Sequence, residues 1–157
     1  PELEARLNAA LLKVPYAAGI NNHEGSRMTA EPVAMSWLVG ELQRRHLFFV
    51  DSRTSAKTVA AAEAQEIGLA SVSRDVFLDD TRTAEAISTQ LQTAIKLAHK
   101  QGSAVMIGHP YPVTLEVLER ELPKLKAQGI EWVELRHMIS IRGNQAMGGH
   151  GKNGVYR

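Results

Sequence analysis

Histidines and acids stand at the positions where short apolar runs end. His23 and His109 each follow such a run, and Asp51 comes directly after the apolar run 47–50. Loops at the carboxyl ends of parallel strands face one crevice, so these residues, together with Asp75 after the run 69–73, are expected to share one rim. Imidazole nitrogen and carboxylate oxygen are suitable ligands for a zinc-like ion that keeps an open position for water. Such an ion would activate its bound water and polarise a carbonyl.

Each of these residues also has a structural interpretation. A histidine at a strand end is often a hydrogen-bonded structural residue, and no HExxH-type spacing defines a metal site here. Asp51 can instead hold a loop by accepting backbone N–H bonds, or it can pair with Arg53 or Arg74. Asp79 and Asp80 are expected to cap the helix that follows them.

The elements that would position these residues alternate between strands and helices. Strands are expected at 17–20, 47–50, 69–73, 104–107 and 130–135, with helices before and between them. Thr29 is expected to cap the second helix, Gly68 to end the third, and Pro123 to kink or divide the last. Connections this short imply right-handed crossovers and a mainly parallel sheet. The glycine-rich segment 143–157 has no periodicity, and we expect it to be disordered or docked against something else.

Composition bounds the class of protein. The 157 residues fit one domain, and 18 Lys+Arg against 17 Asp+Glu leave a net charge of +1 without a basic run, which argues against nucleic acid as a partner. The absence of cysteine excludes disulfides and thiol chemistry. No apolar run is long enough to span a bilayer, and no signal sequence is evident. Because the chain opens on Pro1 rather than Met, we expect it to be a fragment with an upstream part.

Four motifs in order carry a family resemblance. They occupy residues 19–26, 48–54, 73–79 and 107–112. Through them the sequence resembles the divergent polysaccharide deacetylase family, a remote branch of the NodB-like carbohydrate esterases, from about residue 1 to residue 138. Glu24 stands at a position where the family commonly has Met, next to the motif histidine.

The resemblance implies a distorted (β/α) barrel, here a partial barrel with about five mainly parallel strands over residues 1–140, followed by a disordered tail at 141–157. It also implies a metal-dependent hydrolase that removes N-acetyl groups from a polysaccharide such as a peptidoglycan-like glycan. The location would be the periplasm or cell envelope, and the chain itself would contact neither membrane nor nucleic acid.

The resemblance also implies roles for individual residues. His23 and His109 would bind the divalent metal, with zinc the expected ion. Asp51 or Asp75 would move protons, and Arg53 and Arg74 would orient those carboxylates or the sugar. The expected substrate-binding residues are Asn21, Asn22 and Tyr111.

The family pattern is incomplete in this chain. The family's opening strand, which ends in paired aspartates, and its histidine-proline-methionine segment are missing from the sequence. We therefore expect this chain alone to bind zinc weakly, to be a poor deacetylase and to self-associate through open strand edges. A non-catalytic glycan-binding or envelope-organising protein is the alternative, and a metal-dependent hydrolase of another ester is a third. The upstream sequence would discriminate best among them.

Overall fold

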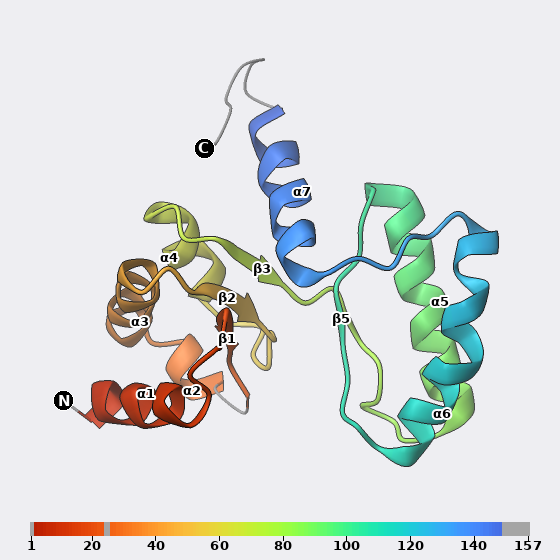
Figure 1. Cartoon of the computed structure of the whole chain (residues 1–157), viewed down its shortest axis with the longest axis horizontal. Coiled ribbons are helices and arrows are strands. Elements are labelled where there is room, and N and C mark those ends of the chain that lie inside the picture. Colours follow the sequence, from red (N-terminus) through yellow and green to blue (C-terminus); the bar gives the residue numbers. More distant parts are fainter. Residues whose placement is uncertain (1, 24–25, 149–157) are drawn as a thin grey trace. The chain divides into compact units, whose positions relative to one another are not determined.

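The computed structural model describes residues 2–23 and 26–148 (Figure 1). The chain divides into two compact units, Pro1–Ser71 and Val72–Arg157. We call them the first and the second unit, and each is described by itself.

The first unit alternates helices with strands in the expected order. Its elements are α1 (Glu2–Lys13), β1 (Gly19–Asn21), α2 (Ser26–Thr29), α3 (Pro32–Arg44), β2 (Phe48–Asp51) and α4 (Ala60–Glu66), and β3 (Ser71–Ser73) begins at its last residue. The sheet order is β1-β2-β3, and β1 pairs with β2 in parallel with Gly19 opposite Phe48. The carboxyl ends of β1 and β2 therefore lie at the same edge of this sheet.

Helix α3 begins at a different cap from the expected one. The Glu31 carboxylate accepts hydrogen bonds from the backbone N–H groups of Val33 (3.3 Å) and Ala34 (2.7 Å). Thr29 is the last residue of α2 and is fully buried, and its carbonyl accepts the Val59 N–H. The prediction of a Thr29 cap is wrong because the chain makes an additional helical turn before α3.

The apolar faces of the helices in the first unit enclose one core. Helix α4 ends before Gly68, whose φ of +70° is the left-handed conformation expected after a helix. The buried apolar residues of this core are Leu7, Met35, Leu38, Val39, Leu42, Phe49, Ala60, Ala64 and Leu69. Phe49 of β2 belongs to this core, which therefore packs against the strand that ends at Asp51.

The second unit contains two short parallel strands with helices packed against them. Its elements are β4 (Val76–Phe77), α5 (Ala84–Gln101), β5 (Met106–Ile107), α6 (Pro112–Glu121), the 3-10 turns η1 (Leu122–Lys124) and η2 (Lys126–Gln128), and α7 (Leu135–Gly148). Strands β4 and β5 pair in parallel with Val76 opposite Met106. Helices α5 and α6 pack side by side (Figure 1). The core cluster contains Leu78, Leu91, Ile95 and Leu125.

Pro123 divides the last predicted helix as expected, since α6 ends at Glu121 and Pro123 lies in the 3-10 turn η1. Helix α5 is capped by Thr83, whose hydroxyl accepts the Ala86 N–H at 3.2 Å. The predicted cap by Asp79 and Asp80 is therefore wrong.

The region after η2 differs most from the prediction. The expected strand at 130–135 is absent: residues 130–134 form no strand, and α7 begins at Leu135. The Ile130 N–H donates to the Leu125 carbonyl. This hydrogen bond closes the preceding turn, so the Ile130 N–H does not pair with a neighbouring strand. Residues 141–148 belong to α7 instead of lacking regular structure, and 149–157 lie outside the described residues.

The predicted class of mixed α/β with parallel strands is confirmed. In the described residues the strands form a three-stranded and a two-stranded sheet. No closed barrel is seen among them, and the partial barrel and the domain boundary at residue 140 stay predictions.

Candidate functional site

The carboxyl ends of β4 and β5 bring a buried aspartate to a partly exposed histidine. Asp79 follows β4 by two residues and His109 follows β5 by two residues. Asp79 Oδ1 lies 3.0 Å from His109 Nδ1, and Asp79 Oδ2 accepts the His109 backbone N–H at 2.6 Å. The Asp79 side chain has no exposed surface, whereas the His109 side chain is 31% exposed. We call these two residues the Asp79–His109 pair.

The backbone between the strand and the histidine must come close to Asp79. A Cβ at Gly108 would lie 3.2 Å from Asp79 Oδ2 and 3.3 Å from the Leu78 Cβ, which is tighter than ordinary packing. Glycine at this position therefore allows the His109 backbone to reach the carboxylate.

Hydrogen bonds outweigh burial in setting the charge of Asp79. Burial alone would raise the pKa of its carboxyl, but the hydrogen bonds from the His109 ring, the His109 N–H and the Thr114 hydroxyl, with the charge of His109, bring the pKa below its ordinary value of 3.8. The Thr114 hydroxyl donates to Asp79 Oδ2 at 2.9 Å. Asp79 is therefore an anion at neutral pH.

An ionised carboxylate beside Nδ1 fixes what the imidazole can do. It favours the proton on Nδ1, which places the lone pair of neutral His109 on Nε2. A lone pair there suits either a general base or a metal ligand supported from behind by a carboxylate. Asp79 is the candidate site residue that sequence reasoning missed, since it was assigned to a helix cap.

An aromatic array surrounds the histidine. The Phe77 ring meets the His109 ring edge-on with centroids 5.7 Å apart, and the Tyr111 ring stacks on His109 at 5.0 Å and 25°. The Arg74 guanidinium lies 5.5 Å from the Phe77 centroid, and the Arg82 guanidinium lies 4.0 Å from the Tyr111 centroid. Tyr111, a predicted substrate-binding residue, is thus engaged by neighbouring side chains, and a sugar that stacked on it would compete with them.

Asp75 lies elsewhere in the second unit. It precedes β4, and its Oδ2 accepts the Val105 N–H at 2.7 Å and contacts Arg142 Nη2 at 2.5 Å. Since β4 and β5 are parallel, Asp75 lies at their amino ends and His109 beyond their carboxyl ends. Asp75 also follows β3 by two residues, as predicted, so only its position relative to His109 differs from the expected shared rim.

In the first unit, polar side chains from β1 and β2 join at one edge. The Asn22 Oδ1 accepts the Ser52 N–H at 2.7 Å, and the Asn21 Nδ2 donates to the Ser52 hydroxyl at 2.8 Å. Asn22 is 5% exposed, and its Nδ2 has no hydrogen-bond partner in the described part of the chain. The contact with Ser52 fixes the amide orientation, which leaves the N–H₂ group as a buried donor without a partner among the described residues. His23 is exposed and follows the same edge.

Asp51 serves the loop after β2. Its Oδ1 accepts the Arg53 N–H at 2.8 Å and its Oδ2 accepts the Thr58 hydroxyl at 2.9 Å, and it is 1% exposed. Arg53 has a φ of +50°, an uncommon conformation for a side-chain-bearing residue. The loop-holding alternative weighed for Asp51 is therefore observed.

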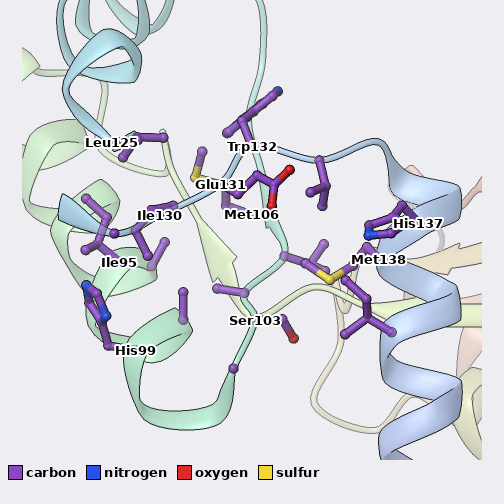
Figure 2. A pocket seen from close by; sticks show the side chains of 18 of the residues that line it. Ile95, His99, Ser103, Met106, Leu125, Ile130, Glu131, Trp132, His137 and Met138 are labelled. Atoms are coloured by element: carbon purple, nitrogen blue, oxygen red, sulfur yellow. The ribbon is translucent and has the colours of Figure 1, made fainter. Parts of the chain in front are cut away.

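A cavity of about 460 Å³ lies in another part of the second unit (Figure 2). It is lined mainly by apolar residues of α5, of segment 129–133 and of the start of α7, among them Ile95, Ile130 and Met138. On β5 it reaches Met106 and the residues before it, and its lining contains none of the predicted site residues.

The fold and the motifs agree with comparisons to known proteins. The sequence profile described as divergent polysaccharide deacetylase matches residues 1–139. The chain belongs to this family. The match confirms the resemblance over nearly the predicted length.

Two relatives of the chain are themselves named as uncharacterized proteins. The chain is 45% identical over 124 residues to an uncharacterized protein of Haemophilus influenzae, covering 79% of this chain and 44% of the relative. It is 43% identical over 119 residues to the uncharacterized protein YibQ of Escherichia coli, covering 76% of this chain and 37% of YibQ. The chain thus spans less than half the length of these two relatives.

A solved structure supports the fold. The crystal structure of an uncharacterized protein from Agrobacterium tumefaciens C58 has a TM-score of 0.75 with this chain at 24% identity, covering 77% of this chain and 49% of that one.

The described residues include a histidine oriented by a carboxylate, as at many metal sites, but not a complete set of metal ligands. The Asp79–His109 pair has the carboxylate–histidine arrangement that orients metal-bound imidazoles. No group of three or more His, Cys, Asp or Glu gathers in a metal-binding arrangement among residues 2–23 and 26–148. Within these same ranges, no helix combines the length and apolar character of a membrane span.

Proposed function

We propose that the protein is a polysaccharide deacetylase of the cell envelope that hydrolyses N-acetyl groups on a glycan, and that the Asp79–His109 pair handles the protons. The observation that carries the proposal is a partly exposed imidazole held by a fully buried carboxylate at 3.0 Å, at the carboxyl ends of parallel strands in a chain of the deacetylase family.

The proton steps follow from the geometry of this pair. His109 Nε2 removes a proton from a water molecule as the water oxygen bonds to the acetyl carbonyl carbon. Asp79 stabilises the resulting imidazolium through Nδ1. The imidazolium then returns the proton to the amide nitrogen as the C–N bond breaks, which gives acetate and a free amino sugar.

A divalent ion, with zinc the first candidate, is part of the proposal. His23 and His109 are each a proposed ligand, considered separately because they belong to different units. When bound, the ion would polarise the acetyl carbonyl and activate water. If His109 binds the ion, the proton steps pass to another base. Asp51 and Asp75 stay candidate proton carriers, with Arg53 and Arg74 as their orienting partners.

Substrate binding is proposed for residues of both units, each considered by itself. In the first unit, Asn21 is exposed and can meet a sugar hydroxyl, whereas the Asn22 Nδ2 is buried and would reach a sugar oxygen only after the surrounding chain moved. Tyr111 contributes through the array in which it stacks on His109. A glycan substrate also accounts for the proposed periplasmic or envelope location.

One observation favours the non-catalytic alternative of glycan binding. Asp51 and Asp75, two expected catalytic carboxylates, are both engaged in hydrogen bonds that hold loops. A protein that kept the fold and the polar residues at its strand ends, but did not catalyse deacetylation, would show the same hydrogen bonds at Asp51 and Asp75.

Acetate release from N-acetylated chito-oligosaccharides tests the proposal. Replacing His109 with Ala should lower the rate at least about 100-fold, the contribution of a positioned base. His99→Gln on α5 is the matched control and should retain the rate. Because the chain spans less than half the length of the two relatives, the assay is run on a protein of their full length. Oligosaccharide binding without acetate release by that protein would establish the binding alternative instead.

A further inference from the structure

Arg82 is the one side chain of the aromatic array that sequence reasoning did not single out. It is exposed, lies one residue before the Thr83 cap of α5, and its guanidinium lies over the Tyr111 ring at 4.0 Å from the centroid. Tyr111 in turn stacks on His109 at 5.0 Å. One aromatic ring therefore separates the Arg82 cation from the histidine of the proposed site.

The Arg82 cation has no anionic partner in the described part of the chain. Asp80 and Glu85 are its acidic neighbours in sequence, yet none of the ion pairs or hydrogen bonds among the described residues involves its guanidinium. A surface arginine whose only role was to balance these acids would be expected to contact one of them. The Tyr111 ring, and not an acidic side chain, holds the Arg82 guanidinium in place.

A cation–π contact positions a guanidinium without using its N–H donors. An arginine has five such donors in a planar fork that matches the two oxygens of a carboxylate. The contact with Tyr111 also reduces the conformational freedom that the side chain would otherwise lose on binding. Arg82 is thus a preorganised receptor for a planar anion beside the histidine.

We propose that Arg82 binds a carboxylate carried by the glycan next to the sugar that is deacetylated, so that the substrate class is an acidic polysaccharide. This inference rests on the proposed function for the site and adds its specificity. Arg82 selects the substrate and takes no part in the proton steps.

Binding of two matched oligosaccharides tests the inference without requiring turnover. One is a tetramer of N-acetylglucosamine, and the other alternates N-acetylglucosamine with glucuronate, so that both carry N-acetyl groups and only the second carries carboxylates. Titration calorimetry on this chain should show the acidic oligosaccharide binding about tenfold more tightly, the effect of one charge-assisted hydrogen bond.

Three variants separate a specific site from general charge. Arg82→Gln should remove the preference for the acidic oligosaccharide, and Arg82→Lys should retain only part of it, because an ammonium lacks the planar fork. Arg120→Gln removes one exposed positive charge on α6 and should leave the preference unchanged.

The outcomes distinguish this inference from the proposed function. Equal affinity for the two oligosaccharides, an unchanged preference in Arg82→Gln, or an equal loss in Arg120→Gln overturns the acidic-substrate inference and leaves deacetylation standing. Failure of both oligosaccharides to bind overturns the glycan function and the inference with it.

Discussion

The Asp79 carboxylate makes the stability of the fold depend on pH. Its pKa is lowered in the folded state, so its ionised form contributes stability above the ordinary value of 3.8, and that contribution is lost as the pH falls through the lower folded-state value. Asp79→Asn should reduce the free energy of unfolding by about 2 kcal/mol at pH 7, because buried donors lose a charged acceptor. The difference from the unmodified protein should shrink below pH 3.8.

Urea denaturation at pH 7 and pH 3 measures both quantities. Asp80→Asn is the control, since Asp80 is the exposed neighbour and its loss should change stability by less than about 0.5 kcal/mol. A loss of stability in Asp79→Asn that stayed constant between the two pH values would contradict the linkage.

Two glycines should respond to alanine with opposite signs. In Gly108→Ala the new Cβ would approach Asp79 Oδ2 and Leu78, so we expect a loss of about 1–3 kcal/mol. In Gly40→Ala, within α3, no atom lies within 4 Å of the new Cβ, and the helix should gain about 0.5–1 kcal/mol. Thermal unfolding compares the two variants, and a stabilised Gly108→Ala would show that the backbone need not approach Asp79 so closely.

At the scale of residues, the sequence predicted where His109 lies along the chain, but it did not predict its hydrogen bond to Asp79. His109 follows its strand as expected, because a buried apolar run ending in polar residues marks a strand end directly. Asp79 was assigned to a cap because an aspartate before a helix usually is one, and the hydrogen bond to His109 joins residues 30 apart that no local pattern links. The apolar run 76–78 directly before Asp79, which resembles the run before His109, was the signal that could have found it.

At the scale of elements, Arg142 fastens α7 to the start of β5. Its Nη2 contacts Asp75 Oδ2 at 2.5 Å and its Nε donates to the Ser103 hydroxyl at 3.1 Å. Both side chains of the ion pair are largely buried, with 23% and 22% exposed. Because α7 has a weak apolar stripe, this contact should account for much of its attachment.

Arg142→Gln should therefore loosen α7 selectively. We expect backbone amides of α7 to exchange about fivefold faster, which corresponds to about 1 kcal/mol, while α5 amides keep their rates. Arg136→Gln, an exposed arginine on the same helix, is the matched control. Equal acceleration in both variants would mean that the loss of positive charge, and not the contact with Asp75, loosens the helix.

Elements with strong local signals were predicted and those that depend on partners were not. Helix α5 has an apolar stripe, and its C-terminal Gly102 adopts the left-handed conformation, so its bounds follow from the sequence. The apolar and β-branched residues at 130–135 are typical of a strand, but a strand also requires a hydrogen-bonded neighbour, and the Ile130 N–H bonds to the Leu125 carbonyl instead. Strand β5 was predicted within the apolar run 104–107, whereas β4 contains only two residues, too few for a period of two to indicate it.

At the scale of the whole molecule, the chain holds its candidate residues in two units with separate cores. Asn22, Asp51 and His23 belong to the first, and the Asp79–His109 pair belongs to the second. The family profile spans both, which is why four motifs far apart in the sequence could be recognised together. Sequence patterns identify such motifs one by one. How many of their side chains can bind the same metal ion depends on the tertiary structure.

Zinc binding tests the role of the two histidines in the chain as a whole. Since no group of three ligands gathers in the described ranges, we expect this chain to bind zinc weakly. His23→Ala and His109→Ala should each weaken binding at least tenfold if both are ligands, and Asp79→Asn should weaken it about tenfold through the imidazole it orients. His99→Gln is the control, and competition with a zinc-sensitive dye measures all five proteins. Unchanged affinity in both alanine variants would exclude the histidines as ligands and leave His109 to act as a base; unchanged affinity in His23→Ala alone would confine the ligand role to His109.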